Sequence, residues 1–407
     1  MLSRFASITS LGMAMLFGAA PTFTQASTDT FEACRKAEAQ PSIAACSKLI
    51  SSDPDDPNRA IAYFSRGFSY EKISKLDEAI RDYSEAIRID PKYVAAFNNR
   101  CSAHNSQKQY SLAIQDCARA IALDPKFASA YLGRGNAHRD AGNYDLAIQD
   151  FSKALELDPH LSTALLGRAF SYGRKGDYDK ALGDYTRHIQ QLPNNAAPYN
   201  NRGVSYELVR DYSSAIRDFS EAIRLHPTYA LAYSNRCSAY TKRREYDKAI
   251  EDCSEALKLN PDDMRSYLFR AHAHELNSDY AKAISDYSEA IRIDPDLAFA
   301  LNNRCWVRAI INDIENALSD CNRALAIQPN DPFTLDSRGF VYLKMGQFDN
   351  AITDYNAALK SRPKNATSLY GRGLALKRKH RIDAARTDIE AALAADPTVS
   401  EFFKELE

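Results

Sequence analysis

The sequence lacks an excess of charge of either sign. In 407 residues, 52 Lys and Arg stand against 53 Asp and Glu, for a formal net charge of -1. Proteins that bind nucleic acid present a basic face, and proteins held on anionic lipid carry a polybasic segment, so neither partner is expected. Apolar residues are not scarce, because 45% of the chain is hydrophobic. This content excludes a disordered chain and predicts a folded protein.

Motifs of the common catalytic sites are also missing. The chain has no phosphate-binding Gly-x-x-x-x-Gly-Lys loop, no Gly-x-Ser-x-Gly nucleophile turn and no His-Glu-x-x-His zinc motif. It has neither a close Cys-x-x-Cys pair nor a Cys–His cluster, which disfavours a metal site. We therefore expect no enzymatic activity, no cofactor and no bound metal.

Residues 1-26 have the pattern of a cleaved signal peptide. Met1 to Arg4 supply a positive end, the apolar stretch Ile8 to Ala20 follows, and Thr24-Gln25-Ala26 offers a small-x-small cleavage site. The apolar stretch is shorter than the roughly 20 residues that a membrane span needs. The sequence thus predicts an exported protein without a membrane span, periplasmic or secreted, and a bacterial periplasm is the favoured compartment.

The strongest feature of the sequence is a period of 34 residues. Eleven of the 16 prolines lie in strict register, each 34 residues after the one before. They are Pro57, Pro91, Pro125, Pro159, Pro193, Pro227, Pro261, Pro295, Pro329, Pro363 and Pro397. Between them one pattern recurs ten times from Ala60 to Val399. Such a period is typical of a repeat protein built from stacked helical or strand units.

Within each repeat, numbered 1 to 34 with its proline at position 32, apolar residues form two helical stripes. Positions 4, 8 and 11 share one stripe, and positions 17, 20, 24, 27 and 28 share the other, at spacings of three or four residues. Position 20 is always Ala, and position 8 is always small. The proline ends the second helix because it has no N–H and disfavours a helical residue before it. Each repeat therefore predicts two helices, A and B.

The pattern resembles the tetratricopeptide repeat, written Trp-x-x-Leu-Gly-x-x-Tyr, then Ala-x-x-x-Phe, then Pro in 34 residues. One repeat matches it at Gly203, Tyr206, Ala215, Phe219 and Pro227, and another at Gly67, Tyr70, Ala79, Tyr83 and Pro91. The resemblance implies an all-α fold in which helix A pairs with helix B and successive pairs stack into a right-handed superhelix.

The predicted organisation follows from this frame. The signal peptide at 1-26 precedes a degenerate helical hairpin at 27-59, ten repeats at 60-399 and a C-terminal cap at 400-407. In the cap, Phe402, Phe403 and Leu406 have helical spacing. The ten repeats are 60-93, 94-127, 128-161, 162-195, 196-229, 230-263, 264-297, 298-331, 332-365 and 366-399.

Two positions depart from the family pattern by carrying charge on the inward stripes. Position 7, normally Leu, is Arg66, Arg100, Arg134, Arg168, Arg202, Arg236, Arg270, Arg304, Arg338 and Arg372. Position 23, commonly apolar, is Asp82, Asp116, Asp150, Asp184, Asp218, Asp252, Asp286, Asp320, Asp354 and Asp388. An unpaired buried charge would cost several kcal/mol, so we expect a ladder of Arg–Asp ion pairs. The alternative is an anion-binding row of arginines.

The eight cysteines form a second pattern. The same three repeats have Cys at position 8 and at position 24, and no other repeat has Cys at either. In the family, position 8 is where helix A approaches helix B, so the pairs predict disulfides within hairpins. The predicted disulfides are Cys34–Cys46 in the leading hairpin, Cys101–Cys117, Cys237–Cys253 and Cys305–Cys321. The alternative is buried free thiols that act as small apolar residues.

The resemblance also places a ligand groove along helix A, at positions 2, 5, 6, 9, 12 and 13. The candidate groove residues are Asn98, Asn99, Asn200, Asn201, Asn235, Asn302, Asn303, Trp306 and Phe340. Asn amides can hold a peptide backbone through donors and acceptors, although Asn is also frequent at position 6 of such repeats. Trp306, the only Trp, together with Phe340 is the expected binding hot spot.

We therefore expect a non-catalytic interaction scaffold that binds a protein or an extended peptide in its groove. The alternative is a carbohydrate-associated module that serves secretion or exopolysaccharide export.

Overall fold

The computed structural model describes residues 25–35, 38–52 and 56–406. The predicted signal peptide lies outside these ranges except for Gln25 and Ala26, which begin the first helix. The described residues form 23 α-helices and one 3-10 helix, with no strand among them. The described chain is therefore all-α, as the sequence predicts. Within the described residues no helix is both long and apolar enough to cross a bilayer.

The chain divides into two compact units, one that ends at Lys175 and one that begins at Gly176. The first contains α1 (Gln25–Cys34), α2 (Ala39–Ser52), α3 (Arg59–Lys72), α4 (Leu76–Ile89), α5 (Val94–Ser106), α6 (Tyr110–Leu123), α7 (Ala128–Asp140), α8 (Tyr144–Leu157) and α9 (Ser162–Lys175).

The second unit contains α10 (Tyr178–Gln191), α11 (Ala196–Leu208), α12 (Tyr212–Leu225), α13 (Ala230–Lys242), α14 (Tyr246–Leu259), α15 (Met264–Leu276), α16 (Tyr280–Ile293), α17 (Ala298–Ile310), α18 (Ile314–Ile327), α19 (Pro332–Lys344), α20 (Phe348–Ser361), α21 (Ala366–Arg378), α22 (Ile382–Ala395), α23 (Val399–Phe403) and η1 (Lys404–Leu406).

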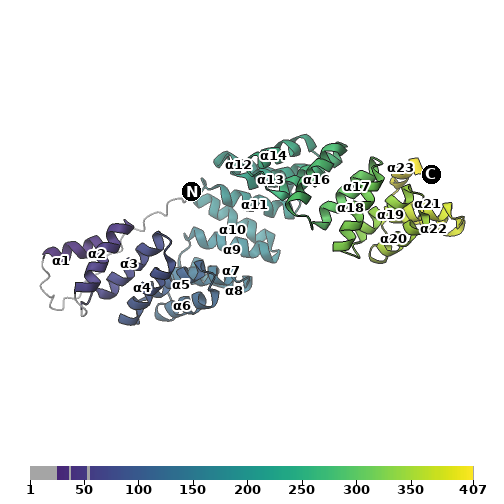
Figure 1. The fold of residues 1–407 in the computed structure, drawn as a ribbon. Coiled ribbons are helices and arrows are strands. Elements are labelled where there is room, and N and C mark those ends of the chain that lie inside the picture. The colour runs from purple at the N-terminus through teal and green to yellow at the C-terminus, as the bar shows by residue number, and fades with distance from the viewer. Residues whose placement is uncertain (1–24, 36–37, 53–55, 407) are drawn as a thin grey trace. The chain divides into compact units, whose positions relative to one another are not determined.

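In each unit the helices stack in the order in which they occur in the chain (Figure 1). From α3 to α22, odd-numbered helices are the A helices of the repeats and even-numbered ones the B helices. Within a unit each helix packs on the helices before and after it, and neighbouring A helices such as α5 and α7, or α17 and α19, also touch. This nearest-neighbour packing is the architecture of a helical solenoid.

Shortly after helix A, position 15 has a left-handed backbone in every repeat. Its φ is positive at Ser74, Lys108, Gly142, Gly176, Arg210, Arg244, Ser278, Asn312, Gly346 and His380. A residue in this conformation stops an α-helix and turns the chain back. Only three of the ten are Gly, the residue that adopts it without steric cost, so sequence patterns hide this regularity.

The two helices of a hairpin approach each other at positions 8 and 24. A Cβ atom built on Gly135 would lie 2.8 Å from the Phe151 ring, and one on Gly167, at position 6 of the next repeat, would lie 2.5 Å from it. Both distances are too short for real atoms, so the Phe151 ring requires small residues on both sides. Side-chain size at position 24 is therefore matched to its own repeat and to the next one.

Candidate functional site

Nine of the ten predicted Arg–Asp pairs lie within one unit, and the structure brings all nine together. The pairs are Arg66–Asp82, Arg100–Asp116, Arg134–Asp150, Arg202–Asp218, Arg236–Asp252, Arg270–Asp286, Arg304–Asp320, Arg338–Asp354 and Arg372–Asp388, with closest N···O distances of 2.6–2.7 Å. In the pair formed by Arg202 and Asp218, Nε and Nη2 donate to the two carboxylate oxygens at 2.7 and 2.8 Å. The tenth pair, Arg168–Asp184, would join the two units and stays a prediction.

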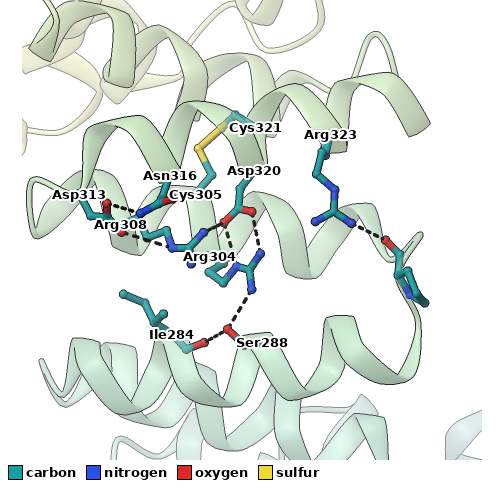
Figure 2. A network of polar contacts seen from close by, with 11 residues as sticks. Ile284, Ser288, Arg304, Cys305, Arg308, Asp313, Asn316, Asp320, Cys321 and Arg323 are labelled. Carbon is teal, nitrogen blue, oxygen red and sulfur yellow. Dashed lines mark hydrogen bonds and ion pairs between the residues drawn. A yellow bond between two sulfur atoms is a disulfide. The ribbon is translucent and has the colours of Figure 1, made fainter.

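Each pair lies within one repeat, and the third guanidinium nitrogen reaches the repeat before it. In Figure 2, Arg304 binds Asp320 on α18 and donates from Nη1 to the Ser288 hydroxyl on α16, at 2.9 Å. The Ser288 hydroxyl donates to the Ile284 carbonyl, which leaves its oxygen free to accept from the arginine. The ladder therefore connects neighbouring hairpins as well as the two helices of one hairpin.

The acceptor is a hydroxyl or an amide at position 25 of the preceding unit. Eight contacts follow this rule: Arg100–Ser84, Arg168–Ser152, Arg202–Thr186, Arg236–Ser220, Arg270–Ser254, Arg304–Ser288, Arg338–Asn322 and Arg372–Asn356. Arg66 instead donates to Ser47 of the leading hairpin, 19 residues before it. Arg134 faces Ala118 instead, and its side chain is 26% exposed, the largest value among the nine paired arginines. The sequence has Ser at position 25 in five of the ten repeats, Asn in two and Thr in one, a signal that the ladder prediction did not use.

The arginines also lie beside aromatic rings from their own helix. The Arg236 guanidinium carbon is 5.7 Å from the centre of the Tyr233 ring and 5.8 Å from that of Tyr240. Burial and the hydrogen bonds act against each other on Asp252, and burial prevails, so its pKa lies above the ordinary value. With its Nε, Nη1 and Nη2 atoms bound inside the protein, Arg236 has little capacity left for an external anion.

The cysteine pairs lie where the sequence predicts them, each across its own hairpin. Cys101–Cys117, Cys237–Cys253 and Cys305–Cys321 have Cα atoms 5.5 Å apart, and Cys34–Cys46 has 4.7 Å. All four are disulfides, and no free cysteine occurs among the described residues. In the three repeats they replace the contact that an aromatic ring makes with a small residue elsewhere. Figure 2 shows one of them beside the Arg304 pair.

Two of the candidate groove amides are not open to a ligand, which corrects the expectation for Asn200 and Asn235. Both are buried, at 2% and 4% exposure. Asn235 Nδ2 donates to Asn200 Oδ1 at 2.9 Å, and Arg265 Nη2 donates to Asn235 Oδ1 at 3.2 Å. Their physical role is to satisfy one another between neighbouring A helices, because a buried polar group without a partner is costly.

The other Asn candidates are half-buried and bind within the protein. Asn98 donates to Asn99 at 3.2 Å, Asn200 to Asn201 at 3.4 Å, and Asn302 to Asn303 at 3.3 Å. Asn99 and Asn303, at position 6, also hydrogen bond to the phenol groups of Tyr83 and Tyr287 at position 24 of the preceding repeat. Position 6 thus lies at the seam between hairpins, which accounts for amides there without a ligand.

A half-buried carboxylate adjoins this seam. The Tyr83 hydroxyl donates to Glu71 Oε2 at 2.7 Å, and Ser102 of the next repeat donates to Oε1 at 3.5 Å. Burial raises the pKa of Glu71 above its ordinary value, although the two hydrogen bonds lower it. Burial likewise raises the pKa of Glu207, to which Ser238 donates at 2.6 Å. These carboxylates at position 12 of helix A were not singled out from the sequence.

The expected hot spot at Trp306 and Phe340 is covered by the C-terminal segment. The rings of Trp306 and Phe402 are stacked with centroids 5.1 Å apart, and Phe340 contacts Phe402 at 5.0 Å and Phe403 at 5.7 Å. Phe340 is only 4% exposed. The expectation of an open aromatic site is therefore corrected, because the protein's own phenylalanines fill it.

We call residues 399–406, which form α23 and η1, the C-terminal strap. The strap contacts α21 and α22, as a cap on the last hairpin would. Its aromatic contacts then reach α19 and α17, so it lies across the A helices of the last three repeats. The helical spacing of Phe402, Phe403 and Leu406 predicts a cap, but it does not show which surface of the repeats these side chains cover.

Apolar side chains remain exposed elsewhere on the A helices. Phe299 on α17 and Phe333 on α19, both at position 2, are 60% and 55% exposed. In the first unit, Phe68 and Phe170 at position 9 are also exposed. Among the described residues no group of three or more His, Cys, Asp or Glu could hold a metal ion.

The family comparison finds tetratricopeptide-repeat models at residues 60–93, 128–161, 230–263, 265–297 and 338–400. No curated protein matches the chain. Among solved structures, one similar chain comes from the APC/C hetero-tetramer Cut9-Hcn1, with 19% identity over 90% of this chain and 83% of that one and a TM-score of 0.50.

Shorter structures match parts of the chain. MamA is 25% identical over 41% of this chain and 92% of its own, with a TM-score of 0.39. YrrB, described as a TPR protein with an unusual peptide-binding site, is 21% identical over 45% of this chain and 95% of its own, with a TM-score of 0.41. Together with the ten 34-residue units and their paired helices, the family matches establish that the chain is a tetratricopeptide-repeat protein, an α-helical solenoid.

Proposed function

We propose that the protein is a non-catalytic scaffold that binds a protein or peptide segment along its A helices. The observation that supports this most is the exposure of Phe299 and Phe333 on two A helices that touch each other. An exposed aromatic pair costs solvation free energy and typically marks a surface that a partner covers. Arg362 lies over the Phe333 ring at 4.2 Å and adds a cation beside the apolar pair.

The Asn row contributes less to this proposal than the sequence suggests. Asn200 and Asn235 bind each other, so ligand contacts from the row would fall to the half-buried amides Asn99, Asn201 and Asn303. Aromatic and aliphatic side chains would then supply most of the binding energy, and the amides would orient the peptide backbone through hydrogen bonds.

We further propose that the protein is exported and works in an oxidising compartment. Four disulfides support this, because cytosolic thiols are normally kept reduced. The sequence pattern of residues 1-26 agrees with export.

Crosslinking in a cell-envelope extract, followed by mass spectrometry, tests the scaffold. We expect Phe299→Ala with Phe333→Ala to lose partners that the native chain captures. Ile327→Ala is the matched control, because Ile327 is an exposed apolar residue on the B helix of the Phe299 repeat. If both variants lose the same partners, or neither loses any, the proposed face is wrong. Loss of a polysaccharide in place of a protein would favour the carbohydrate-associated alternative.

A further inference from the structure

The C-terminal strap resembles a bound ligand more than a continuation of the array. It is a five-residue α-helix followed by a three-residue 3-10 helix, far shorter than the 13- or 14-residue helices of the repeats. Helices of this length are not stable alone in water, so the strap is held by its side-chain contacts. Its position across α17, α19 and α21 is the position that a peptide would take on an A-helix face.

Aromatic contacts provide most of that attachment. Phe402 stacks on Trp306 while Phe403 is buried and stacks on Tyr370 at 5.3 Å. Phe402 remains 38% exposed, so of the two phenylalanines only Phe403 is fully covered. An exposed hydrogen bond from Arg378 Nη2 to the Leu406 carbonyl, at 3.1 Å, adds a polar link. Phe403 and Val399 belong to the apolar core of the last repeats, whereas Phe402 is the partly exposed contact.

The site beneath the strap has a charge preference. Lys344 on α19 lies beside the strap, where burial lowers its pKa and the negative charge of Glu405 opposes that shift. Its Nζ donates to the Ala309 carbonyl at 2.8 Å, which fixes the cation at the edge of the aromatic cluster. Glu401 and Glu405 outnumber Lys404 in the strap, so it carries a net negative charge that complements this lysine.

The site also has unfilled space. A cleft of about 580 Å³ lies between the strap and the A helices of repeats 7 to 9. Its walls include Leu276, Tyr280 and Ile310 from the repeats, and Phe402 and Leu406 from the strap. The strap thus fills only part of a site that extends toward α15, where Glu275 and Ser278 give the cleft a mixed polar and apolar lining.

We propose that the A-helix face of α15, α17 and α19 binds a short helical peptide with two adjacent aromatic residues and a net negative charge, and that the C-terminal strap occupies this site when the partner is absent. The proposal rests on the scaffold function and specifies its partner. Displacement of the strap would expose Trp306 and Phe340 to the incoming segment and leave Lys344 to pair with its acidic residues.

Trp306 reports on this site directly, because it is the only Trp in the chain. The probe is a synthetic peptide of residues Thr398 to Glu407, and the control peptide has Ala in place of both phenylalanines. Each is titrated into the full native chain and into the Phe402→Ala, Phe403→Ala variant. We expect the native-sequence peptide to change Trp306 emission saturably in the variant, with an affinity at least tenfold higher than in the native chain. The control peptide should leave the emission of both proteins unchanged.

A second variant covers the case in which the double substitution unfolds the last repeat. Glu405→Lys keeps both phenylalanines but sets like charges against Lys344, so the native-sequence peptide should bind this chain more tightly than the native chain. Helix content, measured by circular dichroism, identifies the variant that is folded.

Failure of the peptide to bind a folded variant would overturn the proposal and leave the strap as a fixed cap. A dimer in the native chain that the Phe402→Ala, Phe403→Ala change converts to monomer would also overturn it, because the occupant would then be the strap of a second copy. Neither result affects the crosslinking experiment, which depends on Phe299 and Phe333.

Discussion

Arg202 shows how an inward-facing charge is accommodated in these repeats. Three of its nitrogens bind Asp218 and Thr186, and the rings of Tyr199 and Tyr206 lie on either side at 5.7 and 6.0 Å. The hydrogen bond with Asp218 raises the pKa of the guanidinium. Asp218 is buried, so its negative charge depends on Arg202 for stabilisation.

We expect Arg202→Ala to lower the free energy of unfolding by about 3 kcal/mol, because it leaves Asp218 buried and unpaired. The joint change Arg202→Leu with Asp218→Tyr removes both charges and should cost much less. Urea unfolding followed by circular dichroism gives both values. Equal losses for the single and the joint variants would refute a role for the pairing.

Glu71 makes stability depend on pH in the direction opposite to that of most carboxylates. Its folded-state pKa is raised, so the folded protein holds a proton that the unfolded chain has released. Stability from this group is therefore present below the ordinary pKa of Glu and is lost as pH rises through the raised folded value. Glu71→Gln keeps an oxygen that can accept from Tyr83 and removes the charge.

We expect Glu71→Gln to raise the melting temperature at pH 7 and to leave it unchanged at pH 4. The control is Glu78→Gln, at a half-buried position of α4. Thermal denaturation between pH 4 and 7 measures both. A gain that is the same at every pH would mean that protonation of Glu71 is not the cause.

At the scale of helices and hairpins, position 24 has two ways to fill the same space. Repeat 3 places Phe151 between Gly135 and Gly167, while repeat 2 closes Cys101 and Cys117 into a disulfide and has Gly133 at position 6 of the next repeat. Repeat 6 differs, because Phe269 occupies position 6 after its disulfide and packs against that cluster.

This arrangement predicts that Cys101→Gly with Cys117→Phe is tolerated, since Gly133 leaves space for the ring as Gly167 does. The matched change Cys237→Gly with Cys253→Phe should be strongly destabilising, because the new ring would meet Phe269. Melting temperatures under oxidising conditions distinguish the two. Equal losses would show that the residue at position 6 does not limit position 24.

Apart from Arg134, the ladder arginines also bond to the hairpin before them. At the position that would face Arg134 the preceding repeat has Ala118, which offers no side-chain acceptor. Ala118→Ser would offer Arg134 Nη1 the acceptor that Ser84 offers Arg100. We expect it to raise the free energy of unfolding by about 1 kcal/mol, since a hydrogen bond to a charged group outweighs the lower helix propensity of Ser. Ser220→Ala should produce the reverse loss, and urea unfolding measures both. No change from either would place the strength of the ladder in the carboxylate pairs alone.

At the scale of the whole chain, the described helices of each unit contact mainly helices that are close in sequence. Each helix packs on its sequence neighbours within a unit. A local defect should therefore stay local, as nearest-neighbour models of repeat proteins require.

We expect Arg100→Ala to increase amide hydrogen exchange in α3 to α7 while leaving α15 to α20 unchanged. Exchange followed by mass spectrometry of peptides from the full chain measures this difference. Uniformly faster exchange along the chain would indicate one cooperative unit instead.

The sequence by itself determined the helices, their pairing and the partners of the charged and cysteine residues. Those partners lie 16 residues apart in every described ladder pair and in three disulfides, because a hairpin of fixed length brings the same two positions together each time. A periodic pattern can reveal such contacts since one short stretch of chain contains both residues. The ladder's bonds to position 25 have the same spacing, so they too were within reach of the sequence.

Only the tertiary structure decided which A-helix residues are exposed. Asn200 and Asn235 satisfy each other from neighbouring repeats, and the strap reaches back across three repeats to cover Trp306 and Phe340. These contacts depend on how hairpins stack and on the path of a non-repeating end. They do not recur with the period, so no sequence regularity marks them. The same stacking of hairpins decides that Phe299 and Phe333 stay exposed.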